Sequence, residues 1–201
     1  MAIKNILQFP NSMLAQSADL VVVFDEKIAE LSADLRETAK AFNAEGLAAT
    51  QVGALYRMFV IKDHTTNEYI TCINPVITTI QVSPDLDSVE GCLSFPGVYE
   101  KVKRHSSIRV SYQDEGGVET DRTLSEVNAV AFQHELDHLN GIVFTAHMGK
   151  LQKHLALKKL EKTKRLMKRQ SQQIEAMMTK ELAKVQEGRK TLHTEVVPAT
   201  V

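Results

Sequence analysis

The sequence contains little that would support export, membrane insertion or a disulfide-based fold. Only two cysteines, Cys72 and Cys92, occur in 201 residues, whereas a secreted disulfide scaffold of this size usually carries more. The longest apolar run, from Leu20 to Phe24, is far too short to span a bilayer. The N-terminus shows neither the apolar segment of a signal peptide nor the Arg- and Ser-rich composition of a transit peptide. We therefore expect a cytoplasmic protein with no membrane partner.

Charge is distributed unevenly along the chain, although the formal net charge is only −1. Residues 1–146 contain 11 Lys and Arg against 20 Asp and Glu, whereas residues 147–170 contain 9 Lys and Arg against a single acid, Glu161. The remaining 31 residues balance at 4 against 4. An acidic body therefore carries a strongly basic segment near its C-terminus, which serves either solubility or attraction to a polyanion such as RNA.

The hydrophobic pattern predicts two helices on either side of a β-rich region. Apolar residues recur at spacings of three and four over residues 25–42, and Asp25 is suited to cap the start of that helix. A second helix is expected over residues 125–140, with Ser125 as its N-cap and Gly141 as its C-terminal stop.

Between these helices, short stretches rich in β-branched and aromatic residues predict strands bounded by turn-forming residues. The expected strands cover residues 58–61, 69–74, 76–81 and 107–113. The Asn74-Pro75 step marks a strand edge or bend, because proline restricts the residue before it. Residues 46–53, which are mostly small and have glycine at both ends, are expected to form a loop.

The second expected helix carries an HExxH pentad, residues 134–138. Histidines four residues apart project from one helix face, so His134 and His138 can reach one metal ion. Glu135 follows the first histidine and is placed to act as a general base toward a bound water. The pentad also arises by chance, so two histidines on a partly exposed helix remain an alternative.

A catalytic metal site of this kind needs a third protein ligand. Downstream of the pentad stand His147 and His154, within the basic segment and without the glycine-bearing extension of metzincins. Upstream stands Cys92, between glycine and leucine and just before a Pro-Gly turn. A lone cysteine is most often a small buried hydrophobe, which is the interpretation favoured for Cys72 within its expected strand.

Three segments together resemble the signature motifs of the peptide deformylase family. They are Gly46-Leu47-Ala48-Ala49-Thr50-Gln51, Glu90-Gly91-Cys92-Leu93-Ser94 and Gln133-His134-Glu135-Leu136-Asp137-His138. The segments occur in the family's order and at suitable spacings, and the opening Ile6-Leu7-Gln8-Phe9-Pro10 is also similar. The likeness covers roughly residues 3–150 and implies hydrolysis of the N-formyl group from the formyl-methionine of newly made proteins.

The resemblance implies a role for each matching residue. The family's metal ligands correspond here to Cys92, His134 and His138, and its general base corresponds to Glu135. The glutamine of the first motif, Gln51, and the backbone N–H of Leu93 would donate to the formyl oxygen as an oxyanion hole. The positions expected to contact substrate are Gly46, Glu45, Gly91, Tyr99 and Val130.

One divalent metal ion is the expected cofactor. A thiolate with two imidazoles suits zinc, copper or iron by ligand softness, but a blue-copper site would give the HExxH pentad no purpose. The resemblance implies Fe²⁺ in the cell, with Zn²⁺, Ni²⁺ or Co²⁺ as possible substitutes.

Two departures from the family pattern concern substrate contacts rather than the metal. The first motif usually opens with glycine, an apolar residue and glycine, whereas this chain has Ala44-Glu45-Gly46. A carboxylate at Glu45 would attract basic residues of the substrate unless it points to solvent. Many family members have an arginine near the position of Tyr99, and others carry an aromatic residue there.

The expected fold is α+β, with antiparallel β structure around the HExxH helix and a long helix outside. We expect a catalytic domain over residues 1–147, a basic helix over 148–187 ended by Gly188, and a disordered tail over 188–201. The expected partners are nascent formyl-methionyl polypeptides and, through basic residues 148–170, the ribosome and its RNA.

Two other functions remain open at this point. An HExxH endopeptidase would take its third ligand from a histidine or glutamate downstream of the pentad, whereas a deformylase needs Cys92. A non-catalytic ribosome- or RNA-binding protein would account for the basic segment, but it would leave the acidic body and the three motifs unexplained.

Overall fold

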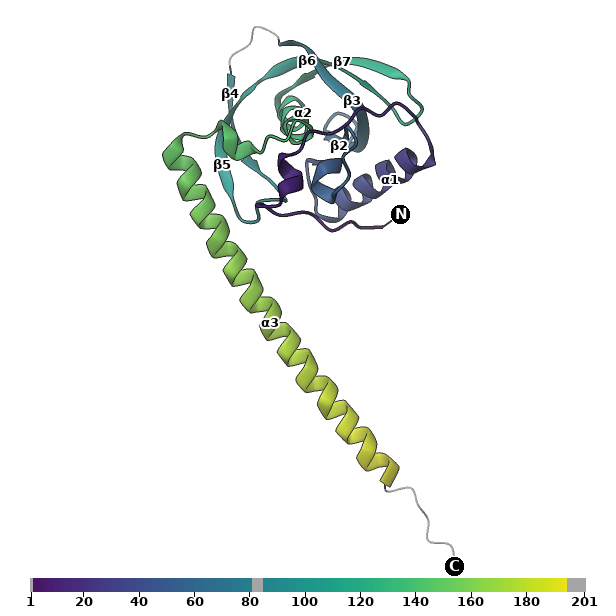
Figure 1. Cartoon of the computed structure of the whole chain (residues 1–201), viewed down its shortest axis with the longest axis vertical. Helices are drawn as coiled ribbons and strands as arrows, with labels where there is room; N and C mark the ends of the chain where they lie inside the picture. Colours follow the sequence, from purple (N-terminus) through teal and green to yellow (C-terminus); the bar gives the residue numbers. More distant parts are fainter. Residues whose placement is uncertain (1, 81–84, 195–201) are drawn as a thin grey trace, which may run out of the picture.

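The computed structural model describes the backbone of residues 2–80 and 85–194, and side chains as far as residue 186. A rounded body holds every strand, and one long helix projects from it (Figure 1). The helices are α1 (Glu26–Ala41), α2 (Glu126–Leu139) and α3 (Lys150–Thr194), with 3₁₀ turns at Ser12–Ala15, Ala49–Val52 and Phe144–His147. The strands are β1 (Gly46–Ala48), β2 (Met58–Asp63), β3 (Glu68–Ile80), β4 (Asp85–Gly91), β5 (Tyr99–His105), β6 (Ser107–Gln113) and β7 (Glu119–Ser125). No helix within the described ranges is long and apolar enough to cross a membrane.

The strands form two antiparallel sheets. Five of them pair in the order β1-β2-β3-β6-β7, and β4 pairs with β5 in a separate two-stranded sheet. The α+β class with antiparallel sheets and a long C-terminal helix is therefore confirmed.

Strand β2 lies between two helices, which explains its continuous apolar sequence. Alternate side chains of a strand point to opposite faces of its sheet. Phe59 and Ile61 pack in the core cluster that contains Phe132 of α2, whereas Met58 and Val60 pack with apolar residues of α1. The HExxH helix α2, labelled in Figure 1, is thereby packed against the main sheet, and His138 near its end lies 3.3 Å from Cys92 in the loop that follows β4.

The ends of the first two helices are close to those expected from sequence. The Asp25 side chain accepts a hydrogen bond from the Ile28 N–H at 3.2 Å, as an N-cap does. Ser125 is the N-cap residue of α2 as expected, although its side chain makes no capping hydrogen bond. Gly141, with φ of +70°, donates its N–H to the His138 carbonyl at 3.1 Å and ends the helix as expected.

Two expectations about the β structure were wrong, and three strands were not predicted. Residues 46–53 form strand β1 and a 3₁₀ turn rather than a loop, because β1 pairs with β2. The two strands expected over 69–74 and 76–81 are the single strand β3, and the bend expected at Asn74-Pro75 is an irregularity within it, where Asn74 adopts φ of +50°. The Asn74 side chain compensates for it by bonding the Val21 N–H at 2.9 Å and the Val21 carbonyl at 2.8 Å. Strands β4, β5 and β7 were not predicted, because they are rich in charged residues and lack an apolar pattern of their own; each pairs with a neighbouring strand along the chain.

Helix α3 extends to Thr194, beyond the end expected at residue 187. A glycine inside a helix costs only about 1 kcal/mol relative to alanine, so Gly188 does not end it. Residues 188–194, expected to begin a disordered tail, are helical, and residues 195–201 lie outside the described residues. Near its start α3 packs on the body, where Ala156 and Leu160 are buried with apolar side chains near the β4–β5 sheet.

Candidate metal centre

Three side chains converge where the end of β4 meets α2. One ligand atom from each of Cys92, His134 and His138 lies within 4.8 Å of the other two. The Sγ of Cys92 is 3.3 Å from Nε2 of His138, and the two histidine ring centroids are 5.1 Å apart. The spacing of four residues on α2 aligns the rings one turn apart, and Cys92 directly follows the last residue of β4.

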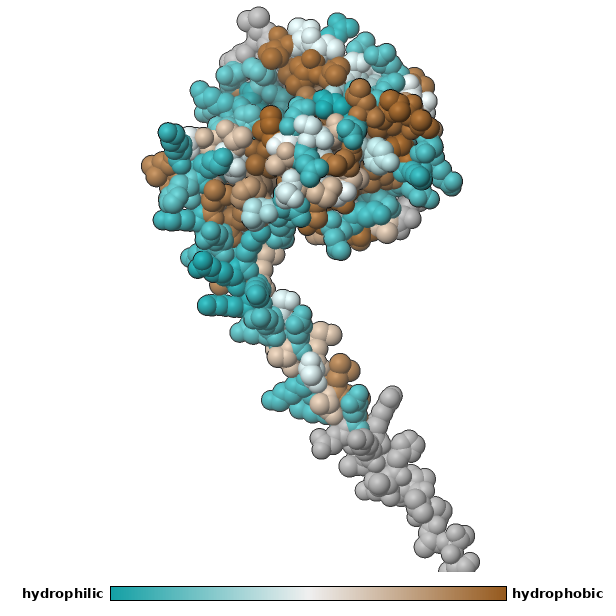
Figure 2. Space-filling model, in the orientation of Figure 1, coloured by the Kyte–Doolittle hydropathy of each residue, from teal (hydrophilic) through white to brown (hydrophobic). Residues whose placement is uncertain are grey.

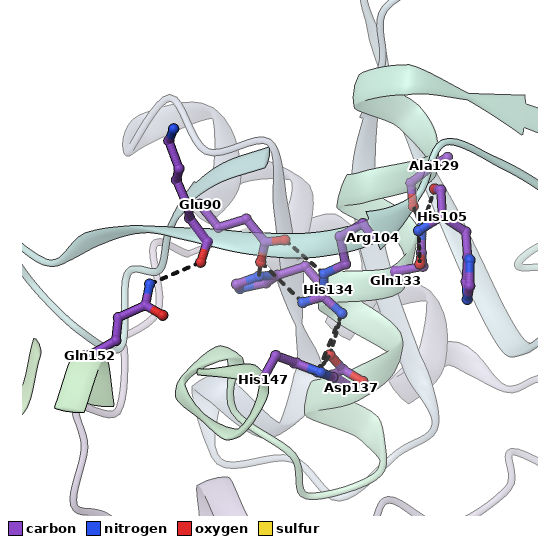
Figure 3. A network of polar contacts seen from close by, with 10 residues as sticks. Glu90, Arg104, His105, Ala129, Gln133, His134, Asp137, His147 and Gln152 are labelled. Atoms are coloured by element: carbon purple, nitrogen blue, oxygen red, sulfur yellow. Dashed lines mark hydrogen bonds and ion pairs between the residues drawn. The ribbon is translucent and has the colours of Figure 1, made fainter. Parts of the chain in front are cut away.

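A buried ion-pair network fixes the orientation of the first histidine (Figure 3). Oε2 of Glu90 lies 2.7 Å from Nδ1 of His134, which leaves the Nε2 atom of that ring free for a ligand bond. Arg104 donates to both oxygens of Glu90, at 2.7 and 3.0 Å, and to Asp137 at 2.6 Å. Burial alone would raise the pKa of Glu90, but hydrogen bonds from His134 and Arg104 outweigh it and lower that pKa to about 2.

Sequence reasoning did not assign roles to Glu90 and Arg104. Their side chains are each 4% exposed, although charged residues are almost never buried without a partner. Glu90 lies inside the second motif, but only the antiparallel pairing of β4 with β5 brings Arg104 across to it. The sequence signal for Arg104 is weak, because β5 carries several basic residues and nothing in the sequence indicates which of them is buried.

The second histidine is held in its neutral form. Burial lowers the pKa of His138 well below its usual range, and the neighbouring His134 lowers it further. A neutral imidazole is the form that binds a metal ion. His138 therefore needs no proton removed before it can act as a ligand.

Glu135 is enclosed beside this cluster. The residue is 4% exposed, and its Oε2 atom has no hydrogen-bond partner in the part of the chain that the structure describes. Burial raises the pKa of its carboxyl to about 7. A Cβ added at Gly46 would lie 2.6 Å from Oε1 of Glu135, so the absence of a side chain on β1 makes room for the carboxylate.

Gln51 presents its amide group to the same cluster. Its Oε1 atom accepts the Ala48 N–H at 2.9 Å, which fixes the orientation of the amide. The Nε2 atom then lies 3.2 Å from Oγ of Ser94 and 3.5 Å from Sγ of Cys92. Leu93, between these two residues, lines the adjacent pocket.

A pocket of about 750 Å³ opens onto the cluster. All the residues expected to contact substrate line it, namely Glu45, Gly46, Gly91, Tyr99 and Val130. Val127 and Val130 of α2 contribute apolar side chains to its lining. Gly91 is closely approached, since a Cβ there would lie 2.5 Å from the ring of Tyr99.

Glu45, at the pocket rim, pairs with His64, a contact that the sequence did not predict. Its Oε2 atom is 2.5 Å from Nε2 of His64, and the two side chains are 56% and 41% exposed, respectively. The His64 N–H donates to the Asn128 side chain at 3.1 Å, which ties the pair to α2. The carboxylate therefore lies at the pocket edge and has a basic partner.

The downstream histidines lie apart from the cluster. His147 bonds Asp137 at 2.7 Å, on the far side of the Arg104 network, and His154 is exposed on α3. Cys72, a residue of β3, is fully buried in the core, as the sequence predicted. Within the described residues, the group that could hold a metal takes its third ligand atom from Cys92.

Comparison with known proteins identifies relatives of this arrangement. The family model described as "Polypeptide deformylase" matches residues 3–154. A peptide deformylase of Desulfotalea psychrophila is 38% identical over 81% of this chain and 97% of its own length. A protein of Agrobacterium fabrum described as peptide deformylase-like is 37% identical over 82% of this chain and 99% of its own.

Solved structures agree with the sequence relatives. A peptide deformylase from Legionella pneumophila superposes with a TM-score of 0.79 and 36% identity, over 84% of this chain and 99% of that one. A peptide deformylase from Ehrlichia chaffeensis in complex with actinonin gives a TM-score of 0.77 and 32% identity, over 82% and 99% of the two chains.

Proposed function

This chain belongs to the polypeptide deformylase family, and we propose that Cys92, His134 and His138 hold its metal ion while Glu135 acts as the general base. Its reaction is removal of the N-formyl group from newly made proteins, and peptide deformylases are metalloenzymes. The convergence of the three ligand atoms within 4.8 Å is the observation that carries the assignment.

The donor set fits a divalent transition metal ion. One thiolate and two imidazoles supply three ligands, which leaves the open position typical of a hydrolytic site. When bound, such an ion supplies Lewis acidity to water and to the formyl carbonyl. We propose Fe²⁺ in the cell, with Zn²⁺, Ni²⁺ or Co²⁺ as substitutes, because the soft ligand set accepts each of them.

Glu135 moves the proton in this proposal. Its carboxylate accepts a proton from the attacking water and later delivers it to the nitrogen of the leaving amine. Two features support the role: the Oε2 atom has no partner among the described residues, and Glu135 directly follows the ligand His134 on α2. The products are formate and a peptide with a free N-terminal methionine.

Gln51 and Leu93 stabilise the charge that grows on the formyl oxygen. The amide of Gln51 is held with its N–H donors toward Cys92 by the bond from Ala48. The backbone N–H of Leu93 is the second proposed donor. Donors positioned in advance need no reorganisation during the reaction, which is why such sites contribute strongly to catalysis.

The substrate-binding assignments follow the lining of the pocket. The missing side chains of Gly46 and Gly91 allow the substrate backbone to approach closely. Val130 offers an apolar contact for the methionine side chain, while Glu45 and the exposed Tyr99 border the pocket entrance.

Substitution of each cysteine separates the two thiols experimentally. Cys92→Ser is expected to lose metal and activity together, because a hydroxyl is a poor ligand at neutral pH whereas a cysteine beside a metal binds as thiolate. Cys72→Ser serves as the control and should retain the metal, since Cys72 lies in the core cluster away from the three ligands. Retention of metal and rate by Cys92→Ser would disprove the ligand assignment.

The basic residues of α3 support a second proposal, that the helix docks the enzyme on ribosomal RNA. In this proposal residues 1–147 form the catalytic domain, the first turns of α3 pack on it, and the enzyme works in the cytoplasm, where chains are synthesised. The exposed cations of the segment are Lys150, Lys153, Lys158, Lys159, Lys162, Arg165, Lys168 and Arg169. In Figure 2 the part of α3 nearest the body is mainly hydrophilic. Cations at this density attract a phosphate-rich surface by releasing its counterions.

Charge neutralisation tests this docking more cleanly than deletion. Truncation after Gly149 would remove Ala156 and Leu160 from the core cluster that contains Phe95, and would damage the body. Replacing Lys153, Lys158, Lys159 and Lys162 with glutamine is expected to weaken co-sedimentation with ribosomes and its dependence on salt. The control replaces the exposed Lys27, Lys40, Lys101 and Lys103 instead. Equal co-sedimentation of both variants and the unmodified chain at low salt would rule out docking through α3.

A further inference from the structure

The first half of α3 is fixed against the catalytic body by contacts on successive turns. Ala156 and Leu160 are 1% and 3% exposed in the apolar cluster with Phe95. One turn later, Thr163 lies against Gly97, where an added Cβ would be 2.9 Å from the Thr163 hydroxyl. Lys164 donates from Nζ to the backbone carbonyl of Phe9. Contacts with the body therefore fix the position of α3 from Ala156 as far as Lys164.

These contacts place Met167 at the active-site pocket. Met167 lies one turn after Thr163 and lines the same pocket as Cys92, His134 and Glu135. Its neighbours in the lining include Pro96 and Gly97, which come from the turn after the second motif. Met167 is 47% exposed, so its side chain is available for contact with a bound molecule.

Neither the formyl group nor the methionine side chain of the substrate is expected to occupy the part of the pocket that Met167 lines. The formyl group is a single carbon and is accommodated by the residues around Cys92. The methionine side chain requires an apolar wall, which Val127 and Val130 of α2 supply. What remains of a nascent substrate is the peptide that continues beyond the methionine.

We infer, on the basis of the proposed function, that Met167 contacts the substrate chain beyond the formyl-methionine and determines how strongly longer peptides are bound. Nascent proteins share the first residue and differ in those that follow. Methionine is unbranched and polarizable, so it packs against varied side chains with little penalty. The basic helix thus also forms an outer wall of the active site.

The dependence of the rate on substrate length tests the inference. The probes are formyl-Met amide and formyl-Met peptides extended with alanine and leucine residues to three and six residues. For Met167→Ala, kcat/KM on formyl-Met amide is expected to be unchanged, whereas kcat/KM on the six-residue peptide should fall by about 3- to 10-fold, the range for loss of a partly buried apolar contact. The loss should reside mainly in KM, because the contact is remote from the reacting bond.

Leu166→Ala provides the matched control. Leu166 is 48% exposed on the preceding position of the same helix and does not line the pocket, so its removal should change no substrate. A Met167→Ala profile that matches the unmodified chain at every length, or one that falls equally at every length, would overturn the inference. Failure of the unmodified chain to hydrolyse any formyl peptide would instead contradict the proposed function.

Discussion

Gly46 and Glu135 are packed so closely that a Cβ on the glycine would lie 2.6 Å from the Oε1 atom of the carboxylate. Real Cβ contacts are essentially never this short, so Gly46→Ala must displace Glu135. Misplacement of a reacting group by about 1 Å can reduce a rate on the order of 100-fold. We therefore expect Gly46→Ala to lose about 100-fold in kcat while retaining its metal, as measured by steady-state kinetics and metal analysis on one sample. Gly149→Ala is the control, because an added Cβ there meets nothing within 4 Å. An equal rate for both variants would show that the close packing of Gly46 against Glu135 does not matter for catalysis.

Glu135→Gln separates proton transfer from metal binding. The amide keeps the shape of the side chain but cannot accept a proton from water. Activity should fall by about 10²- to 10⁴-fold, the usual effect of losing a general base, with metal content unchanged. Full activity at full metal occupancy would exclude Glu135 from the mechanism.

Glu90→Gln should weaken metal binding although Glu90 is not a ligand. The carboxylate orients His134 through its Nδ1 atom and is itself held by Arg104. Loss of such an outer partner typically reduces metal affinity by about 10- to 100-fold, which competition with a chelator measures. Asp87→Asn, an exposed acid on the same strand, serves as the comparison. Identical affinities for the two variants would show that the Glu90 network does not support the metal.

Glu45 and His64 should affect substrate choice in opposite directions. Glu45→Ile removes the carboxylate and should raise the rate on formyl-Met peptides while reducing any preference for a basic residue after methionine. His64→Ala removes the partner of Glu45 and should strengthen that preference. Because both side chains are largely exposed, with the pair 2.5 Å apart, we expect effects of only about 1.5- to 5-fold. Competition between formyl-Met-Lys and formyl-Met-Glu peptides measures these effects. The same preference in the unmodified chain, Glu45→Ile and His64→Ala would show that Glu45 points to solvent and does not contact the substrate.

The sequence predicted those features that depend on local spacing. Histidines four residues apart on a helix must share a face, so His134 and His138 could be paired without a structure. The three motifs added Cys92 and Gln51 through resemblance. The helix ends at Asp25 and Gly141 could also be predicted, because capping depends on residues within one turn.

Features that depend on distant partners were not predicted. Arg104 reaches Glu90 only because β5 pairs with β4, and neither strand's sequence alternates between apolar and polar residues. His64 meets Glu45 across the β1–β2 edge. Met167 lines the pocket because α3 is anchored near its start, and helical periodicity alone does not reveal where a helix lies.

Formate release is the most direct test of a metal centre formed by Cys92, His134 and His138. The protein would be purified without oxygen, its metal content measured, and the same sample given formyl-Met-Ala-Ser. We predict about one iron ion per chain, in line with a single three-ligand site, and formate released in equal amount to free Met-Ala-Ser. Cleavage of an internal peptide bond, or no formate from a fully metal-loaded sample, would contradict the account.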